Sequence, residues 1–292
     1  MTEREYAHPL VPDFSEDLFA GTAEWYASYR PAYPYELLGE LVRQAPGRQS
    51  DGRRLVDLAC GPGTVCLRIH GHFDAVLAVD LEPDMIETGR ALARMASADN
   101  IEWLVSRAED VDLAPSSVDL ITIGSAFHRL NRPLVAARAF QWLRPDGILA
   151  EIGTSNGITS GSEPWQQIVL DVYRKWWAKA PSRPSVRQPA DPTLATTEQV
   201  LRDAGFVQVT KREIDIAHSW TGDEIVGYLF STSHASRAIF GDLADYVAEE
   251  LKSALLAYDR TGEFHEMLSA YTLTGKRPAG APSAIAQSAL ES

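Results

Sequence analysis

The sequence lacks long apolar runs and has few cysteines, and both shortages narrow the kinds of protein it can encode. No apolar stretch of the chain reaches the roughly 18 residues that a membrane-spanning helix needs. Residues 1–10 carry charges but no apolar centre, which is unlike a signal peptide. The two cysteines, Cys60 and Cys66, are interpreted as small packing residues rather than as a disulfide or a metal site. We therefore predict a cytoplasmic protein with no membrane partner.

Basic residues are also scarce. The chain has 27 Lys and Arg against 40 Asp and Glu, a net charge of −13, and it contains no basic run. Affinity for nucleic-acid backbones comes largely from clustered Lys and Arg, so no nucleic-acid partner is expected. No carboxylate cluster typical of a magnesium site is evident, and no metal is predicted. The expected partner is a small-molecule substrate, and a homo-oligomer is left open.

Short apolar runs alternate with helical patterns along the first half of the chain. The candidate strands are residues 54–58, 75–80, 101–105, 118–123 and 147–152, and the candidate helices are 35–44, 64–70, 83–96 and 133–143. Such a β-α-β-α order predicts an α/β fold, in which a mostly parallel sheet carries helices on both faces. The 292 residues suffice for one elaborated domain, or for one domain with a lid.

A glycine-rich turn follows the first of these strands. The strand carries Asp57, the turn holds Gly61 and Gly63, and the next strand ends in Asp80. Glycine lets a backbone approach a ligand closely, and a carboxylate at a strand tip can accept hydrogen bonds from both hydroxyls of a ribose. Asp80 could instead cap the helix that begins at Pro83. We favour the ribose interpretation, which predicts a nucleoside-containing ligand.

The order of these residues resembles the class I S-adenosylmethionine-dependent methyltransferases. The segment Tyr26 to Pro34 matches the leader Y-x-x-x-R-P-x-Y-P of small-molecule members that resemble trans-aconitate methyltransferase. The turn with Ala108 and Glu109 matches the family's A-E-D turn, and residues 126–129 resemble A-F-H-W, with Arg129 in place of the tryptophan. The resemblance covers about residues 20–153. It implies a Rossmann-like sheet of seven strands, whose last strand is antiparallel, and S-adenosyl-L-methionine as the cofactor.

The resemblance also implies which residues bind the cofactor. Leu81 and Met85 would lie against the adenine, the turn at Ala108 and Glu109 would bind its edge, and the backbone at Ser125 would face the methionine portion. Tyr26 and Arg30 would reach the amino-acid end, with Arg30 pairing the carboxylate; a surface arginine without this role is the alternative. With the first motif, the predicted cofactor-binding set is Tyr26, Arg30, Asp57, Ala59, Gly61, Gly63, Asp80, Leu81, Met85, Ala108, Glu109 and Ser125.

A nicotinamide-dependent dehydrogenase is the nearest competing interpretation. It also uses a glycine turn and a downstream acid, but Cys66 stands where its third glycine belongs, and Asp57 would repel a pyrophosphate. The chain contains no Tyr-x-x-x-Lys pair. Two further alternatives remain: an S-adenosylmethionine-binding enzyme that catalyses a cyclisation or decarboxylation, and a binding module without catalysis.

His128 is the candidate catalytic residue. It follows the strand expected to end near the transferred methyl group, and imidazole titrates near neutral pH, so it could act as a base or orient the substrate. A hydrogen bond within the cofactor loop is the competing role. His218, His234 and His265 are interpreted as structural. The predicted substrate-binding residues are Phe19, Tyr29, Phe127, His128, Trp165 and Trp220.

These patterns divide the chain into functional segments. We expect an aromatic lid at 1–35, a cofactor-binding core at 36–153, and a helical substrate cap from the insertions 154–204 and 215–265. The remaining core strands are placed at 205–214 and 266–276, and 277–292 is expected to be a disordered tail. The predicted activity is transfer of a methyl group to an oxygen or nitrogen of a small molecule, in secondary metabolism such as antibiotic biosynthesis.

Overall fold

The computed structural model describes residues 19–47, 51–154, 157–182 and 195–280. Most of the predicted lid, residues 1–18, and most of the predicted tail, residues 281–292, lie outside this part of the chain. The described residues form two compact units. Among the described residues, the helical unit comprises 19–31, 157–182 and 215–269, and the sheet unit comprises 32–47, 51–154, 195–214 and 270–280.

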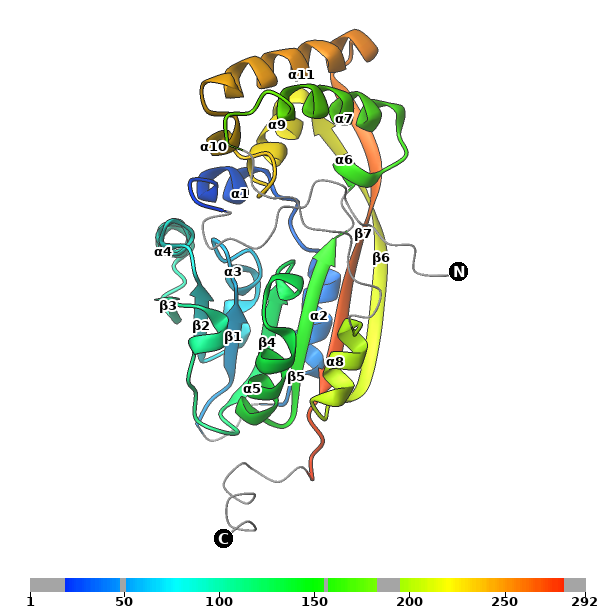
Figure 1. The fold of residues 1–292 in the computed structure, drawn as a ribbon. Coiled ribbons are helices and arrows are strands. Elements are labelled where there is room, and N and C mark those ends of the chain that lie inside the picture. Colours follow the sequence, from blue (N-terminus) through cyan, green and yellow to red (C-terminus); the bar gives the residue numbers. More distant parts are fainter. Residues whose placement is uncertain (1–18, 48–50, 155–156, 183–194, 281–292) are drawn as a thin grey trace. The chain divides into compact units, whose positions relative to one another are not determined.

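One sheet of seven strands organises the fold (Figure 1), in the order β3-β2-β1-β4-β5-β7-β6. Strands β1 to β5 run parallel, and β7 is antiparallel to β5. The predicted α/β fold, with its mostly parallel sheet and an antiparallel late strand, is confirmed. The strands are β1 Arg54–Leu58, β2 Ala75–Asp80, β3 Ile101–Val105, β4 Val118–Gly124, β5 Leu143–Thr154, β6 Val207–Thr221 and β7 Glu263–Lys276.

The last two strands are longer than the sequence predicts. The expected segments were 205–214 and 266–276, but β6 continues to Thr221 and β7 begins at Glu263. Residues 215–221, assigned to a helical insertion, therefore form strand. In this stretch half-buried Ile216 and His218 and buried Trp220 alternate with exposed residues, which is the period of a strand rather than of a helix. In addition, helix α8 (Thr197–Asp203) belongs to the sheet unit rather than to a cap.

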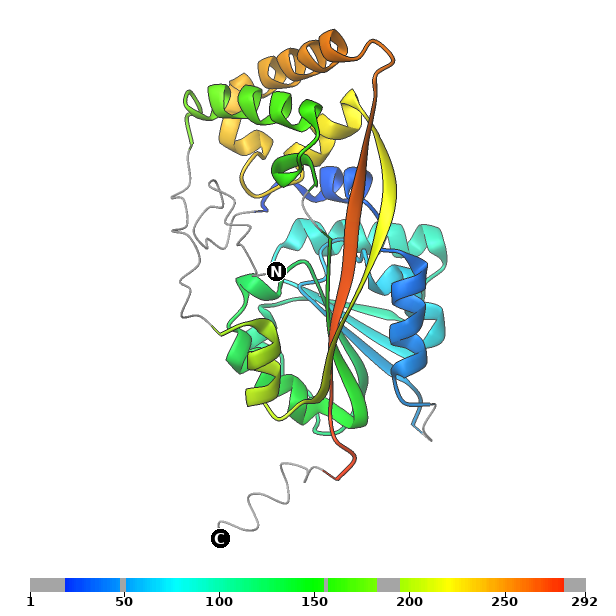
Figure 2. The ribbon, with the colours of Figure 1, turned by 90° about the vertical axis from the view of Figure 1, so that its right-hand side faces the viewer.

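Helices cover both faces of the sheet. In β1, Leu55 and Val56 point to opposite faces because side chains alternate along a strand. Leu55 shares a core with α2 (Tyr35–Gln44), α3 (Cys66–Ile69) and α4 (Pro83–Ala96), whereas Val56 shares one with α5 (Arg132–Trp142) and α8. Figure 2 views the sheet nearly edge-on, with blue α2 on one side and yellow-green α8 on the other. Short 3₁₀ turns complete the unit: η1 His70–His72, η2 Ala108–Asp110 and η3 Phe127–Arg129.

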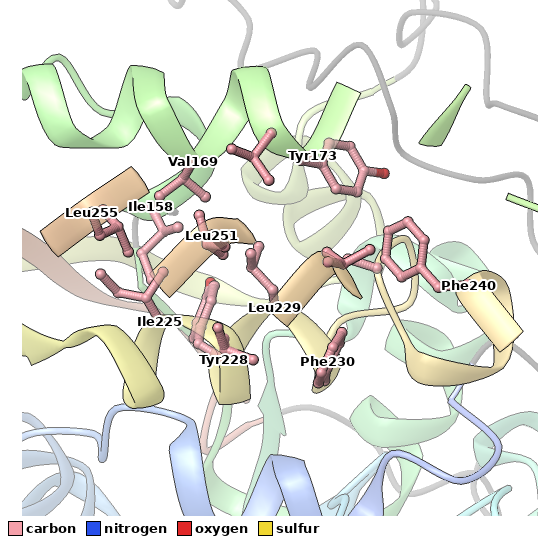
Figure 3. Close-up of a cluster of buried hydrophobic side chains, with 14 of the residues drawn as sticks. Ile158, Val169, Tyr173, Ile225, Tyr228, Leu229, Phe230, Phe240, Leu251 and Leu255 are labelled. Atoms are coloured by element: carbon pink, nitrogen blue, oxygen red, sulfur yellow. The ribbon is translucent and has the colours of Figure 1, made fainter. Parts of the chain in front are cut away.

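The helical unit has its own apolar core (Figure 3). Its elements are α1 Ala23–Tyr29, α6 Gly157–Ser160, α7 Pro164–Trp177, α9 Gly222–Phe230, α10 Arg237–Phe240, η4 Gly241–Leu243 and α11 Ala244–Tyr258. Pairs four residues apart, such as Ile225 with Leu229 and Leu251 with Leu255, line the inner faces of α9 and α11. Capping boxes fix the starts of α7, at Glu163, and α9, at Thr221.

Candidate functional site

The carboxylate of Asp57 lies inside the sheet unit, beneath the glycine turn. It is fully buried, and its two oxygens accept hydrogen bonds from the Thr122 hydroxyl (2.7 Å) and the Cys66 backbone N–H (3.1 Å). Burial raises the pKa of Asp57 to about 6, against the lowering effect of these two donors. Asp57 therefore joins β1, β4 and the start of α3, and fixes the turn from within.

The turn itself has an unusual backbone. Ala59, Gly61 and Gly63 all have positive φ, at 51°, 55° and 88°. An alanine in this region is strained by about 1–3 kcal/mol, a state that persists only where the surroundings enforce it. At Gly63 a Cβ would lie 2.7 Å from Cη2 of Trp103, so only glycine fits there. This close packing holds the turn in a single shape.

Asp80 ties the glycine turn to the beginning of α4. One carboxylate oxygen accepts the Gly61 N–H (2.7 Å) and the other accepts the Glu82 N–H (3.0 Å). Burial raises the pKa of Asp80, and these backbone donors partly offset that effect. Asp80 therefore supports the segment just before α4 rather than capping that helix, whose N-cap residue is Glu82. Each carboxylate oxygen that accepts one backbone N–H keeps a second lone pair for a ribose hydroxyl.

The residues expected around an adenine lie at the ends of β2 and β3. Parallel pairing sets Asp80 opposite Val105, and the Ser106 N–H donates to the Asp80 carbonyl (2.9 Å). Among the predicted residues here, Met85 and Ala108 are buried and Leu81 is half-buried. The Glu109 carboxylate accepts the Asn131 N–H (2.7 Å), just before α5. One of its oxygens is thus already engaged in anchoring a helix.

The predicted residues Ser125, Phe127 and His128 follow the end of β4. Ser125 has a φ of 50°, its N–H donates to the Ile152 carbonyl (2.7 Å), and its Oγ shares a hydrogen bond with the Tyr33 hydroxyl (2.8 Å). His128 is exposed on η3. The Phe127 side chain, expected against the substrate, is 1% exposed and packs in the core around β4. The Phe127 ring therefore packs as part of the protein core.

The predicted residues Tyr26 and Arg30 belong to the helical unit. The Arg30 guanidinium lies over the rings of Tyr26 (4.7 Å) and Tyr228 (4.8 Å). Its Nε donates to the Ser231 hydroxyl (2.8 Å), and its Nη2 donates to the Ser231 carbonyl (3.2 Å). Phe19 packs edge-on against Tyr26, with ring centroids 6.3 Å apart. Arg30 thus has a defined structural role, and its contact with the cofactor stays a prediction.

Trp165 and Trp220 are buried in the helical unit rather than exposed as walls. The Trp165 indole N–H donates to the His265 carbonyl (3.2 Å), and the Trp220 indole N–H donates to Glu266 (2.6 Å). Glu266 also accepts the side-chain amide of Gln166 (2.6 Å), and burial raises its pKa. This carboxylate was not predicted from the sequence, because no local pattern links residue 266 to residues 166 and 220.

The other aromatic and histidine residues of the helical unit also have local contacts. Tyr29 stacks on Trp25, with centroids 5.6 Å apart. The His218 ring packs 4.2 Å from Trp220, and burial lowers its pKa. A cleft of about 360 Å³ is lined by Trp25, Tyr29, Asp223, Val226, Phe230, Arg237, Asp245, Ala248, Glu249 and Lys252. Its cations pair with its own carboxylates, Arg237 with Asp245 (2.7 Å) and Lys252 with Glu249 (2.8 Å).

Within the described ranges, no group of three or more His, Cys, Asp or Glu is arranged to hold a metal ion. No helix in that part of the chain is both long and apolar enough to cross a membrane. Asp80, the glycine turn and Ser125 lie at the carboxyl ends of parallel strands in the sheet unit, which is where open α/β sheets bind their ligands.

Several known proteins are similar to this chain in sequence. Residues 55–147 match the model of a methyltransferase domain family. A Dictyostelium discoideum protein named as a methyltransferase is 25% identical over 259 residues, which cover 86% of this chain and 90% of the relative. The ubiquinone/menaquinone biosynthesis C-methyltransferase of Roseobacter denitrificans is 28% identical over 183 residues, covering 56% of this chain and 70% of that protein.

A solved structure shares the fold. A protein from Anaeromyxobacter dehalogenans, titled as a type II methyltransferase, superposes with a TM-score of 0.57 at 22% identity, over 86% of this chain and 99% of that one. The matched residues 55–147 begin in β1 and end within β5, so they contain the glycine turn, Asp80, the turn at Ala108 and the tip of β4.

Proposed function

Since the chain is a class I S-adenosylmethionine-dependent methyltransferase, we propose that it methylates an oxygen or nitrogen atom of a small-molecule acceptor. The observation that carries the proposal is the Asp80 carboxylate, bonded to the Gly61 N–H at the tip of β2. The net charge of −13 supports a small acceptor over a nucleic acid, because an acidic chain repels phosphate backbones. A role in secondary metabolism and a cytoplasmic location stay predictions.

We propose that the cofactor binds to the sheet unit along the strand tips. Asp80 would accept the ribose hydroxyls with its remaining lone pairs, while the strained turn at Ala59, Gly61 and Gly63 would present its backbone to the ligand. Leu81, Met85 and the turn at Ala108 would surround the adenine. Asp57 supports this site indirectly, since both its oxygens are engaged by protein donors.

When bound, the cofactor supplies an activated methyl group, which leaves its sulfur as the acceptor atom attacks in line. The protein's task is then to position the acceptor, exclude water and receive a proton; positioning alone can contribute about 7–11 kcal/mol. We propose that exposed His128 receives the proton of a hydroxyl acceptor, or orients a neutral amine. That Phe19 and Tyr29 contact the acceptor stays a prediction.

The proposal is tested by binding first and turnover second. Calorimetric titration of S-adenosylhomocysteine should give saturable binding in the wild type. The enzyme, loaded with S-adenosylmethionine, is then offered fractions of small-molecule extracts, and products are analysed by mass. A product heavier by one methyl group supports the proposal. A product of changed structure without an added methyl group would instead identify a cyclase or decarboxylase. Absence of binding in the wild type would overturn the cofactor assignment itself.

A further inference from the structure

The strongest unassigned feature of the sheet unit is a hydrogen bond between two segments that are distant in sequence. The Tyr33 hydroxyl lies 2.8 Å from the Ser125 hydroxyl. Tyr33 precedes Pro34, the N-cap residue of α2, and a residue before proline favours an extended backbone. Its side chain is 5% exposed and belongs to the core shared by β1, β4 and α2. Close packing in this core restricts the movement of the tyrosine ring.

The Tyr33 hydroxyl reaches Ser125 because Gly124 has no side chain. A Cβ at Gly124 would lie 3.2 Å from this hydroxyl and 3.2 Å from the nearer methyl group of Val65. These approaches are tighter than ordinary van der Waals contact. The last residue of β4 therefore leaves just enough room for the tyrosine to contact the turn beyond it.

Ser125 needs such support because its backbone is left-handed. Its φ of 50° is uncommon for a residue with a side chain and costs about 1–3 kcal/mol where it occurs. Two contacts hold it: its N–H donates to the Ile152 carbonyl (2.7 Å), and its hydroxyl bonds to Tyr33. The hydrogen bond to Ile152 continues the pairing of β4 with β5. The hydrogen bond to Tyr33 instead joins Ser125 to a residue outside this strand pair.

We propose that Tyr33 is a positioning residue for methyl transfer, which acts through Ser125 to hold the turn after β4 in the conformation that meets the amino-acid end of S-adenosylmethionine. The proposal rests on the function proposed above. Tyr33 need not touch the cofactor; it fixes the backbone from which residues 126–129, including His128, continue into η3.

The test compares two ligands that share the adenosine portion. S-adenosylhomocysteine carries the amino-acid end, and 5′-methylthioadenosine lacks it. Tyr33→Phe keeps the ring and removes the hydroxyl. Loss of one such hydrogen bond should weaken S-adenosylhomocysteine about three- to tenfold. Binding of methylthioadenosine should change less than about twofold, because the Asp80 end of the site is untouched. Tyr35→Phe is the matched control, since that tyrosine is 66% exposed.

A double-mutant cycle separates positioning from general destabilisation. If Tyr33 acts through Ser125, then Tyr33→Phe combined with Ser125→Ala should bind S-adenosylhomocysteine no more weakly than Ser125→Ala alone. Gly124→Ala, which crowds the same hydroxyl, should reproduce the selective loss even if Tyr33→Phe folds poorly. Equal weakening of both ligands, additive effects in the cycle, or no effect of Tyr33→Phe would each overturn the proposal. Failure of the proposed function would look different, because the wild type would then bind neither ligand.

Discussion

The sheet unit and the helical unit each contain a buried carboxylate whose described hydrogen-bond donors include no cationic side chain. The two carboxylates, Asp57 and Glu266, accept their hydrogen bonds from different kinds of donor. Asp57 accepts a backbone N–H nine residues ahead and a threonine hydroxyl on the neighbouring strand. Glu266 accepts two side-chain N–H groups, from Gln166 and Trp220, which are 100 and 46 residues away. Burial raises the pKa of both groups. A backbone donor nine residues along the chain belongs to a local sequence motif, whereas side-chain donors 46 and 100 residues away belong to none.

The largest expected effect lies in the sheet unit. Asp80→Ala should weaken binding of S-adenosylhomocysteine roughly 30- to 1000-fold, as about 2–4 kcal/mol of charge-assisted hydrogen bonding is lost. Titration calorimetry measures this loss. Asp84→Ala is the matched control, because Asp84 is exposed in the first turn of α4. Similar affinities in wild type and Asp80→Ala would remove the ribose role and leave Asp80 as a support for the glycine turn.

Asp57 should make stability depend on pH. Its folded pKa of about 6 lies above the ordinary value of 3.8, so the folded state binds the proton more tightly. The associated stabilisation, up to about 3 kcal/mol, is present below pH 4 and is lost as the pH rises through 6. Asp57→Asn should flatten this part of the curve of unfolding free energy against pH. An unchanged slope between pH 4 and 6 would contradict the burial argument.

Glu266 provides the corresponding experiment in the helical unit. The Gln166 side-chain oxygen already accepts the Glu163 N–H (2.8 Å), so its amide must donate to Glu266, and the Trp220 indole can only donate. Glu266→Gln therefore loses one acceptor and should lower the free energy of unfolding by about 2 kcal/mol, measured by denaturant titration. Exposed Glu263→Gln on the same strand should be neutral. Equal stabilities of the two variants would refute the need for a double acceptor.

Arg30→Ala should have the smallest effect of these substitutions. It tests whether a residue of the helical unit also binds the cofactor. If it also pairs the carboxylate of the cofactor, Arg30→Ala should weaken S-adenosylhomocysteine by about tenfold, as one charge-assisted hydrogen bond is lost. Methylthioadenosine, which has no carboxylate, should bind as before. If neither affinity changes, Arg30 serves the helical unit alone, through Ser231 and the two tyrosine rings.

Sequence patterns predicted the sheet unit more closely than the helical unit. The ranges 54–58, 75–80, 101–105, 35–44 and 83–96 coincide with observed elements, since each is a local apolar pattern bounded by turn residues. The lengths of β6 and β7 were underestimated, because weak alternation of half-buried residues carries little signal. Two roles were not predicted: the burial of the Phe127 ring in the core of the sheet unit, and the hydrogen bonds that Glu266 accepts from Gln166 and Trp220, which are distant in the sequence.

The two cysteine thiols of the chain can report on the backbone of the glycine turn without any engineered label. Cys60 and Cys66 are the only cysteines in the sequence, both are free and buried, and burial raises the pKa of each. They stand at the two ends of the glycine turn, so neither can react with an alkylating reagent until that turn opens. The rate of thiol labelling therefore measures how often the turn opens, and a ligand that binds there should slow the reaction in proportion to its occupancy.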